Sequence, residues 1–357
     1  MITINDVAKR AGVSISTVSN VLNKNKFVSE ELIRRVSQAV RELEYTANPI
    51  AQKMKFKRTK TIGVISADLC GLFYPYILKG IYKAFHSKGY RLVVMDTEGI
   101  NDNIGSVKKL REGITSLVND RVDGIVFSST VPEEMEADII SDVMKLSSSE
   151  ITTAFVCVEK DMSKFGIDSV CANSVAGADT ATTHLIDVGC ERICHITGPY
   201  YFTVAQDRIT GFKNAMRRGG FEVDDGRMMA NGDYTHKSGY LAMKELLYKM
   251  PNLDGVFVAN DQMSVGAMKA LFEAGKRIPE DVKVIGYDDV FIASALEPSL
   301  STIHVQKYIM GMKAAELLIG QIENNATPGF AVELNSNLVV RRSTVKDAPE
   351  DWILVDW

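Results

Sequence analysis

Residues 3–23 read TINDVAKRAGVSISTVSNVLN, a stretch that predicts two short helices joined by a tight turn. Thr3 has the spacing to Asp6 of a capping pair at a helix start, and the acid suits the positive end of the helix dipole. Gly12 ends the first helix, because glycine tolerates the left-handed backbone needed there. Ser14 caps the second helix. Two helices joined in this way form a helix-turn-helix unit.

The apolar residues around this unit fall on helical faces. Val18, Val21 and Leu22 have the i, i+3, i+4 spacing of one buried face in the second helix. Ser29 begins a third helix with an apolar stripe of Leu32, Val36, Ala39 and Leu43. We therefore expect a compact helical head over residues 1–46.

The first sixty residues are strongly basic. Met1–Lys60 contains twelve lysines and arginines and five acids, a net charge of +7, which leaves −11 for the rest of a chain whose total is −4. A basic block on an acidic body indicates an anionic partner for the block alone. The alternative is a solvated helical face, and the helical plan of the block weakens it.

The second helix of a helix-turn-helix unit enters the DNA major groove, where its early residues meet base edges. Helical phase leaves Ile15, Ser16, Ser19 and Asn20 off the buried face, and the hydroxyls of Ser14 and Thr17 suit phosphate oxygens. The predicted DNA contacts of the head are Thr3, Ser14, Ile15, Ser16, Thr17, Ser19, Asn20 and Asn23.

The motif of residues 3–23, followed by VSEELIRRV at 28–36 and LEY at 43–45, closely resembles the head of the LacI/GalR family of bacterial transcriptional regulators. The resemblance continues through NPIAQKMKFKRTKTIGVI at 48–65. It implies a sequence-specific DNA-binding regulator, a repressor, that acts as a homodimer on a near-palindromic operator.

The resemblance also implies a hinge over residues 47–60, whose short helix forms on operator DNA. Met54 would be pushed between base pairs in the minor groove, a role that suits a flexible apolar wedge. Lys53 and Lys55 flank it and would contact phosphates.

From Thr61 onwards, short β-branched runs alternate with helical stretches, which predicts parallel sheets covered by helices on both faces. Seven apparent strands suit two smaller sheets better than one. The runs are TIGVISA, RLVVMDT, DGIVFSS, TAFVCV, RICHITG, GVFVAND and VKVIGYD.

This body is similar to the two-lobed, periplasmic-binding-protein-like (type I) domain of the same family, which implies an effector-binding and dimerisation domain over 61–344. The resemblance places the first lobe at about 61–162 and 293–324, and the second at about 163–291 and 325–344. The tail, 345–357, is too short for a tetramer-forming heptad helix, so we expect a dimer.

Ligands of open α/β sheets bind beyond the carboxyl ends of the strands, which between two lobes means the cleft. Planar side chains at these ends suit the apolar faces of a sugar, and charged groups suit its hydroxyls. The resemblance implies that Arg208, Asn260 and Asp288 hold polar groups of the effector. The predicted effector site is Phe73, Tyr74, Arg208, Tyr234, Asn260, Asp261 and Asp288. For Asp261, helix capping is an equal alternative.

Two other functions compete with the regulator. A solute-binding receptor is opposed by the absence of a secretory signal and by the basic head. An α/β enzyme with an accessory head is opposed by the absence of G-x-G-x-x-G, G-x-x-x-x-G-K-[ST], H-E-x-x-H and G-x-S-x-G motifs. We therefore expect no enzymatic activity and no cofactor.

The cysteines do not indicate disulfides or a metal. Five are scattered along the chain, and Cys190, Cys194 and His195 lack the spacing of a zinc site. They are better interpreted as buried thiols at a helix-to-strand junction. No apolar run reaches the length of a membrane span, so we expect a cytoplasmic protein without a membrane partner.

Asn20 predicts an altered operator. The family commonly has arginine at this position, which pairs with guanine, whereas asparagine suits the N6/N7 edge of adenine. Selection from a randomised operator library should therefore yield a base pair other than the family's usual G at the position that Asn20 reads. Recovery of that G, with Asn20→Ala leaving the preference unchanged, would show that the inference is wrong.

Overall fold

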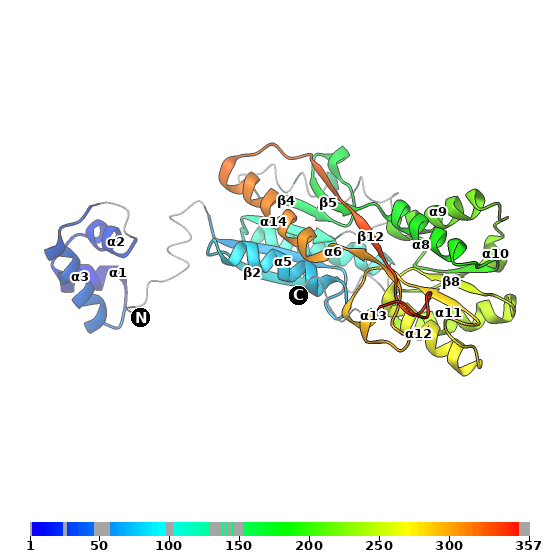
Figure 1. Cartoon of the computed structure of the whole chain (residues 1–357). Coiled ribbons are helices and arrows are strands. Elements are labelled where there is room, and N and C mark those ends of the chain that lie inside the picture. The colour runs from blue at the N-terminus through cyan, green and yellow to red at the C-terminus, as the bar shows by residue number, and fades with distance from the viewer. Residues whose placement is uncertain are drawn as a thin grey trace. The chain divides into compact units, whose positions relative to one another are not determined.

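The chain divides into two compact units, Met1–Thr59 and Lys60–Trp357 (Figure 1). The predicted hinge residues Lys53, Met54 and Lys55 and the end of the tail lie outside the described residues. The computed structural model describes residues 2–23, 27–45, 58–97, 103–128, 138, 140, 141, 145 and 153–349.

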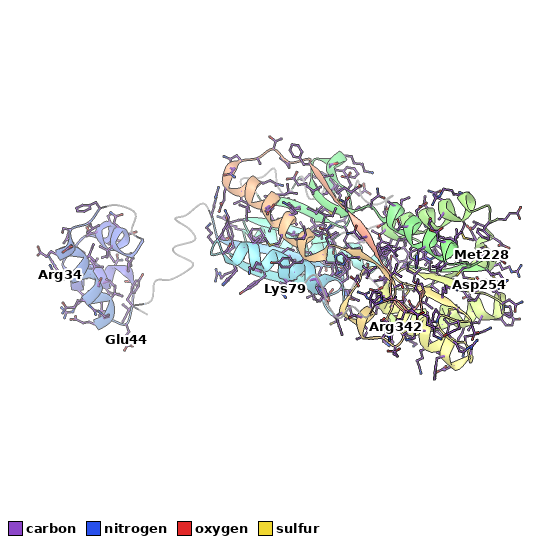
Figure 2. All side chains as sticks on the ribbon, in the orientation of Figure 1. Arg34, Glu44, Lys79, Met228, Asp254 and Arg342 are labelled. Carbon is purple, nitrogen blue, oxygen red and sulfur yellow. The ribbon has the colours of Figure 1, made fainter. Side chains whose placement is uncertain are left out.

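The first unit contains the three predicted helices, α1 (Ile4–Ala11), α2 (Ile15–Asn23) and α3 (Glu30–Glu42). Their apolar faces meet in one small core, and polar side chains such as Arg34 point outwards (Figure 2). The buried members of that core are Val7, Ala8, Ala11, Val18, Val36 and Ala39.

The turn between α1 and α2 is held from both sides. Gly12 has φ 63° and ψ 41°, the left-handed conformation that glycine adopts readily. The Arg35 guanidinium donates to the carbonyls of Ala11 at 2.7 Å and Gly12 at 3.1 Å, and so satisfies acceptors that α1 leaves open. Ser14 Oγ accepts from the backbone N–H of Thr17 at 3.1 Å and caps α2 as predicted.

The first lobe of the second unit is built on six parallel strands in the order β11-β5-β4-β3-β1-β2. Val64 faces α5 (Tyr74–His86) and α14 (Lys307–Asn324), whereas its neighbour Ile65 faces α6 (Asn103–Asn119), so both faces are covered. The strands are β1 (Thr61–Ser66), β2 (Arg91–Asp96), β3 (Gly124–Ser128), β4 (Ala154–Val158), β5 (Asp168–Ala172) and β11 (Ala331–Leu334).

The second lobe has four parallel strands in the order β7-β6-β8-β9, with α8 and α9 on one side and α11 and α12 on the other (Figure 1). The strands are β6 (Ile193–Thr197), β7 (Met229–Asn231), β8 (Gly255–Val258) and β9 (Lys283–Ile285). The helices are α8 (Ser174–Asp187), α9 (Thr203–Arg218), α10 (Asp225–Met228), α11 (His236–Lys249), α12 (Asp261–Glu273) and α13 (Phe291–Ala295).

All seven predicted strands are confirmed, but two further strands lie in a different lobe from the one expected for their segments. The ranges that contain β5 and β11 were assigned to the second lobe, whereas β5 pairs with β4 (Val158 opposite Val170) and β11 pairs with β5. The chain therefore enters the second lobe after Ala172. The remaining crossings run through β10 (Thr302–Val305) and β12 (Ser336–Val339), an antiparallel pair.

None of the helices in the described ranges is both long enough and apolar enough to cross a membrane.

Gly12→Ala should destabilise the head. A Cβ there would lie 2.7 Å from Arg35 Nη2, at a φ of +63° that costs an L-residue about 1–2 kcal/mol. Hydrogen exchange of the buried Val18 and Val36 amides in the full chain should accelerate accordingly. Ser16→Ala, an exposed change on α2, is the matched control. Equal protection in the two variants would contradict this role of Gly12.

Candidate functional site

A cavity lies where the carboxyl ends of the two parallel sheets face each other. Its volume, counted at the centres of water molecules, is about 80 Å³. The lining is Asp68, Gly71, Leu72, Phe73, Tyr74, Glu159, Lys160, Phe202, Thr203, Val204, Arg208, Tyr234, Asn260, Gln262, Asp288 and Val290. The segments that follow β1, β4, β6, β7, β8 and β9 all contribute, as expected for ligand sites of parallel sheets.

Of the seven residues predicted for this site, only Asp261 does not line the cavity. Its side chain is fully buried, with Oδ1 accepting from the Thr302 hydroxyl at 2.7 Å and Oδ2 from the Val290 N–H at 2.9 Å. It is not the helix cap either, because Asn260 Oδ1 accepts from the Met263 N–H at 2.8 Å. Asp261 instead ties the start of α12 to the crossing segments.

Arg208 and Asp288 form an ion pair in the wall, with 3.5 Å between Nη2 and Oδ1 and only 6% of each residue exposed. The guanidinium lies 3.9 Å over the Tyr287 ring and also donates to the Ala259 carbonyl. Burial raises the pKa of Asp288 to about 6, although Arg208 lowers it.

Three buried polar atoms around this pair have no hydrogen-bond partner among the described residues. They are Arg208 Nε, Asp288 Oδ1 and the Tyr234 hydroxyl. Buried polar groups are rarely left in this state, so the arrangement indicates that a polar molecule completes the network.

Aromatic rings form opposite walls. Phe73 and Tyr74 meet edge to face with centroids 5.4 Å apart, and Phe202 stacks near Tyr234 with centroids 6.1 Å apart. Gly198 makes room for the second pair, since a Cβ there would lie 2.3 Å from the Tyr234 hydroxyl oxygen.

Glu159 and Lys160 line the cavity but were missed by the sequence analysis. They directly follow the run TAFVCV, so the rule of polar residues after strands could have found them. Glu159 hydrogen-bonds with Tyr74, and burial raises its pKa to about 7. The Lys160 ammonium donates to the Thr203 hydroxyl of the second lobe at 2.6 Å.

Left-handed backbone marks the same wall. Glu159, Tyr234 and Asp288 have φ of 73°, 68° and 107°, values that non-glycine residues rarely adopt. Such conformations gather at ligand sites because the surrounding structure holds them there.

The predicted DNA contacts of the head have mixed surroundings. Thr3, Ser14, Ile15 and Ser16 are exposed, whereas Thr17 and Asn20 are partly buried. Ser19 is 9% exposed, so its placement off the buried face was wrong. The buried face of α2 is wider than its three apolar residues suggest. The side chain of Asn23 lies outside the description, as do Lys53, Met54 and Lys55.

Cys190 and Cys194 are buried thiols between α8 and β6, as interpreted from the sequence. Burial raises the pKa of each to about 12. The described ranges contain no cluster of three His, Cys, Asp or Glu side chains suited to a metal ion.

Two family models match the chain. The model described as bacterial regulatory proteins, lacI family, matches residues 3–48, and the model of a periplasmic binding protein-like domain matches residues 182–344. The ribose operon repressor of Escherichia coli (strain K12) is 35% identical over 345 residues, which are 96% of this chain and all of that repressor.

Two solved structures share the architecture. The lac repressor dimer bound to operator and the anti-inducer ONPF is 26% identical, with a TM-score of 0.82 over 96% of this chain and 99% of that one. The complex of the transcriptional regulator CelR with cellobiose is 29% identical, with a TM-score of 0.69 over 96% of this chain and all of the other.

Glu159 should make stability depend on pH in a defined direction. Its folded pKa of about 7 exceeds the ordinary 4.5, so its ionisation removes stability as pH rises through that interval. Glu159→Gln should therefore gain melting temperature relative to the wild type between about pH 4.5 and pH 8. Glu112→Gln, on the exposed side of α6, should follow the wild type. Parallel curves for all three proteins would contradict the assignment.

Proposed function

This chain belongs to the LacI family of bacterial regulatory proteins, and on that premise we propose that its cavity binds an uncharged sugar that controls the DNA-binding head. The chain is a DNA-binding transcriptional repressor under allosteric control. The buried Arg208–Asp288 pair, with its unpartnered atoms beside the Tyr234 hydroxyl, carries the proposal for the ligand.

The charges of the cavity favour an uncharged ligand. The lining has three carboxyl groups, on Asp68, Glu159 and Asp288, against two cations, Lys160 and Arg208. Arg208 is already paired with Asp288, and Lys160 is hydrogen-bonded to Thr203. A phosphate or carboxylate would lie among like charges at a poorly hydrated site, which is unfavourable.

The available donors and acceptors suit a diol. A carboxylate beside a guanidinium can accept from one hydroxyl and donate to its neighbour, while flat aromatic rings cover the apolar face of a sugar. The names of the relatives support the same class, because one represses a ribose operon and another is bound to cellobiose.

The repressor acts as a homodimer, in keeping with the lac repressor dimer on its operator. We place the first lobe at the dimer contact, because the edge strand β2 exposes Val93 by 41% and Val94 by 36%. Two heads then read two half-sites of a near-palindromic operator. Insertion of Met54 into the minor groove, between Lys53 and Lys55, stays a prediction from the sequence.

Ligand binding controls the head only through different affinities for two arrangements of the lobes. A sugar that contacts residues of both lobes favours one of those arrangements. We propose rotation of one lobe against the other as the step that decides whether both hinge segments engage the operator.

A thermal-shift assay with D-ribose, cellobiose and D-ribose 5-phosphate tests the ligand class. A sugar that binds the folded chain should raise its melting temperature by mass action, and the phosphate ester should not. A shift with D-ribose 5-phosphate alone would overturn the uncharged class. Recovery of the sugar unconverted separates a repressor from an α/β enzyme.

Asp288→Ala should abolish the shift and the sugar's effect on operator binding, because it removes the acceptor of the buried pair. Affinity for a selected operator should stay within about threefold, roughly 0.6 kcal/mol, of the wild type. Lys346→Ala, which removes an exposed ion pair with Glu280, is the control. A normal sugar response in Asp288→Ala would show that the site is misplaced.

A further inference from the structure

Helix α14 begins at the cavity wall. Its first residue, Lys307, is completely buried, and its ammonium donates to three carbonyls, those of Asp288, Asp289 (3.1 Å) and Val305 (3.0 Å). Asp288 lines the cavity and follows β9 of the second lobe, whereas α14 packs in the first lobe. A buried lysine therefore joins α14 to the backbone of an effector-site residue.

The neighbouring residue is fixed as well. Asp289 has φ 56°, and its carboxylate bridges Arg341 Nη1 at 2.8 Å and His304 Nδ1 at 2.9 Å. Arg341 and His304 belong to the segments that cross between the lobes. A shift of the Asp288 side chain on a ligand is thus transmitted to the carbonyls that Lys307 holds, because the adjacent backbone has little freedom to absorb it.

Helix α14 is clamped to the first lobe along its length. It meets α5 at two glycines, since a Cβ on Gly311 would lie 2.0 Å from the Ile77 carbonyl oxygen and one on Gly80 would lie 2.2 Å from that of Tyr308. Near its other end, Gln321 donates to Asp168 at 2.8 Å. Backbone-to-backbone packing of this kind moves as one body.

The far end of α14 holds the residue at which the second unit begins. Glu323 pairs with Lys60 at 3.5 Å and with Lys88 at 3.1 Å, and accepts from the Tyr90 hydroxyl at 3.3 Å. Lys60 is fixed further by its N–H on Asp123 at 3.0 Å and by its ammonium 4.0 Å over the Tyr90 ring. Exposed ion pairs stabilise little, so their value here is in position.

The 18 residues of α14 span about 27 Å, from the Asp288 backbone to Lys60. Figure 1 shows this helix along the first lobe, from the junction of the lobes to the end where Lys60 lies. We propose that α14 is a rigid connecting element, with Lys307 and Glu323 as positioning residues, that transmits occupancy of the cavity to the start of the hinge. This rests on the proposed function, namely control of the head through the cavity.

A double-mutant cycle on operator affinity tests the proposal without any effector. The operator is selected from a random library by the full-length wild type, and its Kd is measured by fluorescence anisotropy for Lys307→Met, Glu323→Gln and the double variant. The effects of independent sites multiply to within about twofold. We expect the double variant to depart from the product of the single effects by at least about threefold, because either substitution alone disconnects the helix.

Glu316→Gln provides the matched control. Glu316 lies on the same helix in an exposed pair with Lys313 and contacts neither end. Its effect combined with Lys307→Met should be multiplicative. If the Glu323 and Glu316 cycles are equally multiplicative, the proposal is overturned. Should Lys307→Met fail to melt cooperatively, Lys307→Arg replaces it in the same cycle.

A second measurement uses D-ribose when that sugar stabilises the wild type. The fold-change in operator Kd caused by saturating D-ribose should fall at least about threefold in Glu323→Gln and stay unchanged in Glu316→Gln, while the Kd for D-ribose is unchanged in both. An unchanged ratio in Glu323→Gln would overturn the proposal. Failure of the sugar to bind concerns the proposed function alone, because the cycle needs no sugar.

Discussion

The buried ion pair between Arg208 and Asp288 is the interaction on which the arrangement of the effector site depends. Removing both charges from water is costly, and the pair alone, at 3.5 Å, offsets that cost only in part. The Tyr287 ring, the Ala259 carbonyl and the Lys307 ammonium supply further stabilisation. The atoms that stay unpartnered leave a network that a ligand with hydroxyl groups would complete, so binding energy is available for conformational control.

The same constraint explains the backbone on either side of the pair. Asp288 and Asp289 both have positive φ, which non-glycine residues accept only when tertiary contacts compensate. Here the compensation comes from Arg341, His304 and Lys307, which belong to the crossing segments and to α14. The ligand-facing residue and the interlobe connection are therefore one piece of structure, and this makes allosteric control of the head physically reasonable.

The head is assembled by a different kind of interaction. Its turn depends on Gly12, on the Ser14 cap and on Arg35, all of which are exposed or at the helix ends. Local capping of this kind leaves a strong trace in the sequence, so the three helices were predicted correctly. Burial across helices leaves a weaker one, which is why Ser19 was assigned to the wrong face.

By itself, the sequence determined what short-range rules govern: the helix-turn-helix unit, the alternation of strands and helices, and most of the polar residues that follow strands. Capping and periodicity act over a few residues and are therefore legible along the chain. The tertiary structure alone decided the placement of β5 and β11 in the first lobe, the burial of Asp261, and the contact between Lys307 and the Asp288 carbonyl. These depend on hydrogen bonds between segments far apart in the chain, whose pairing is settled by packing and not by local pattern.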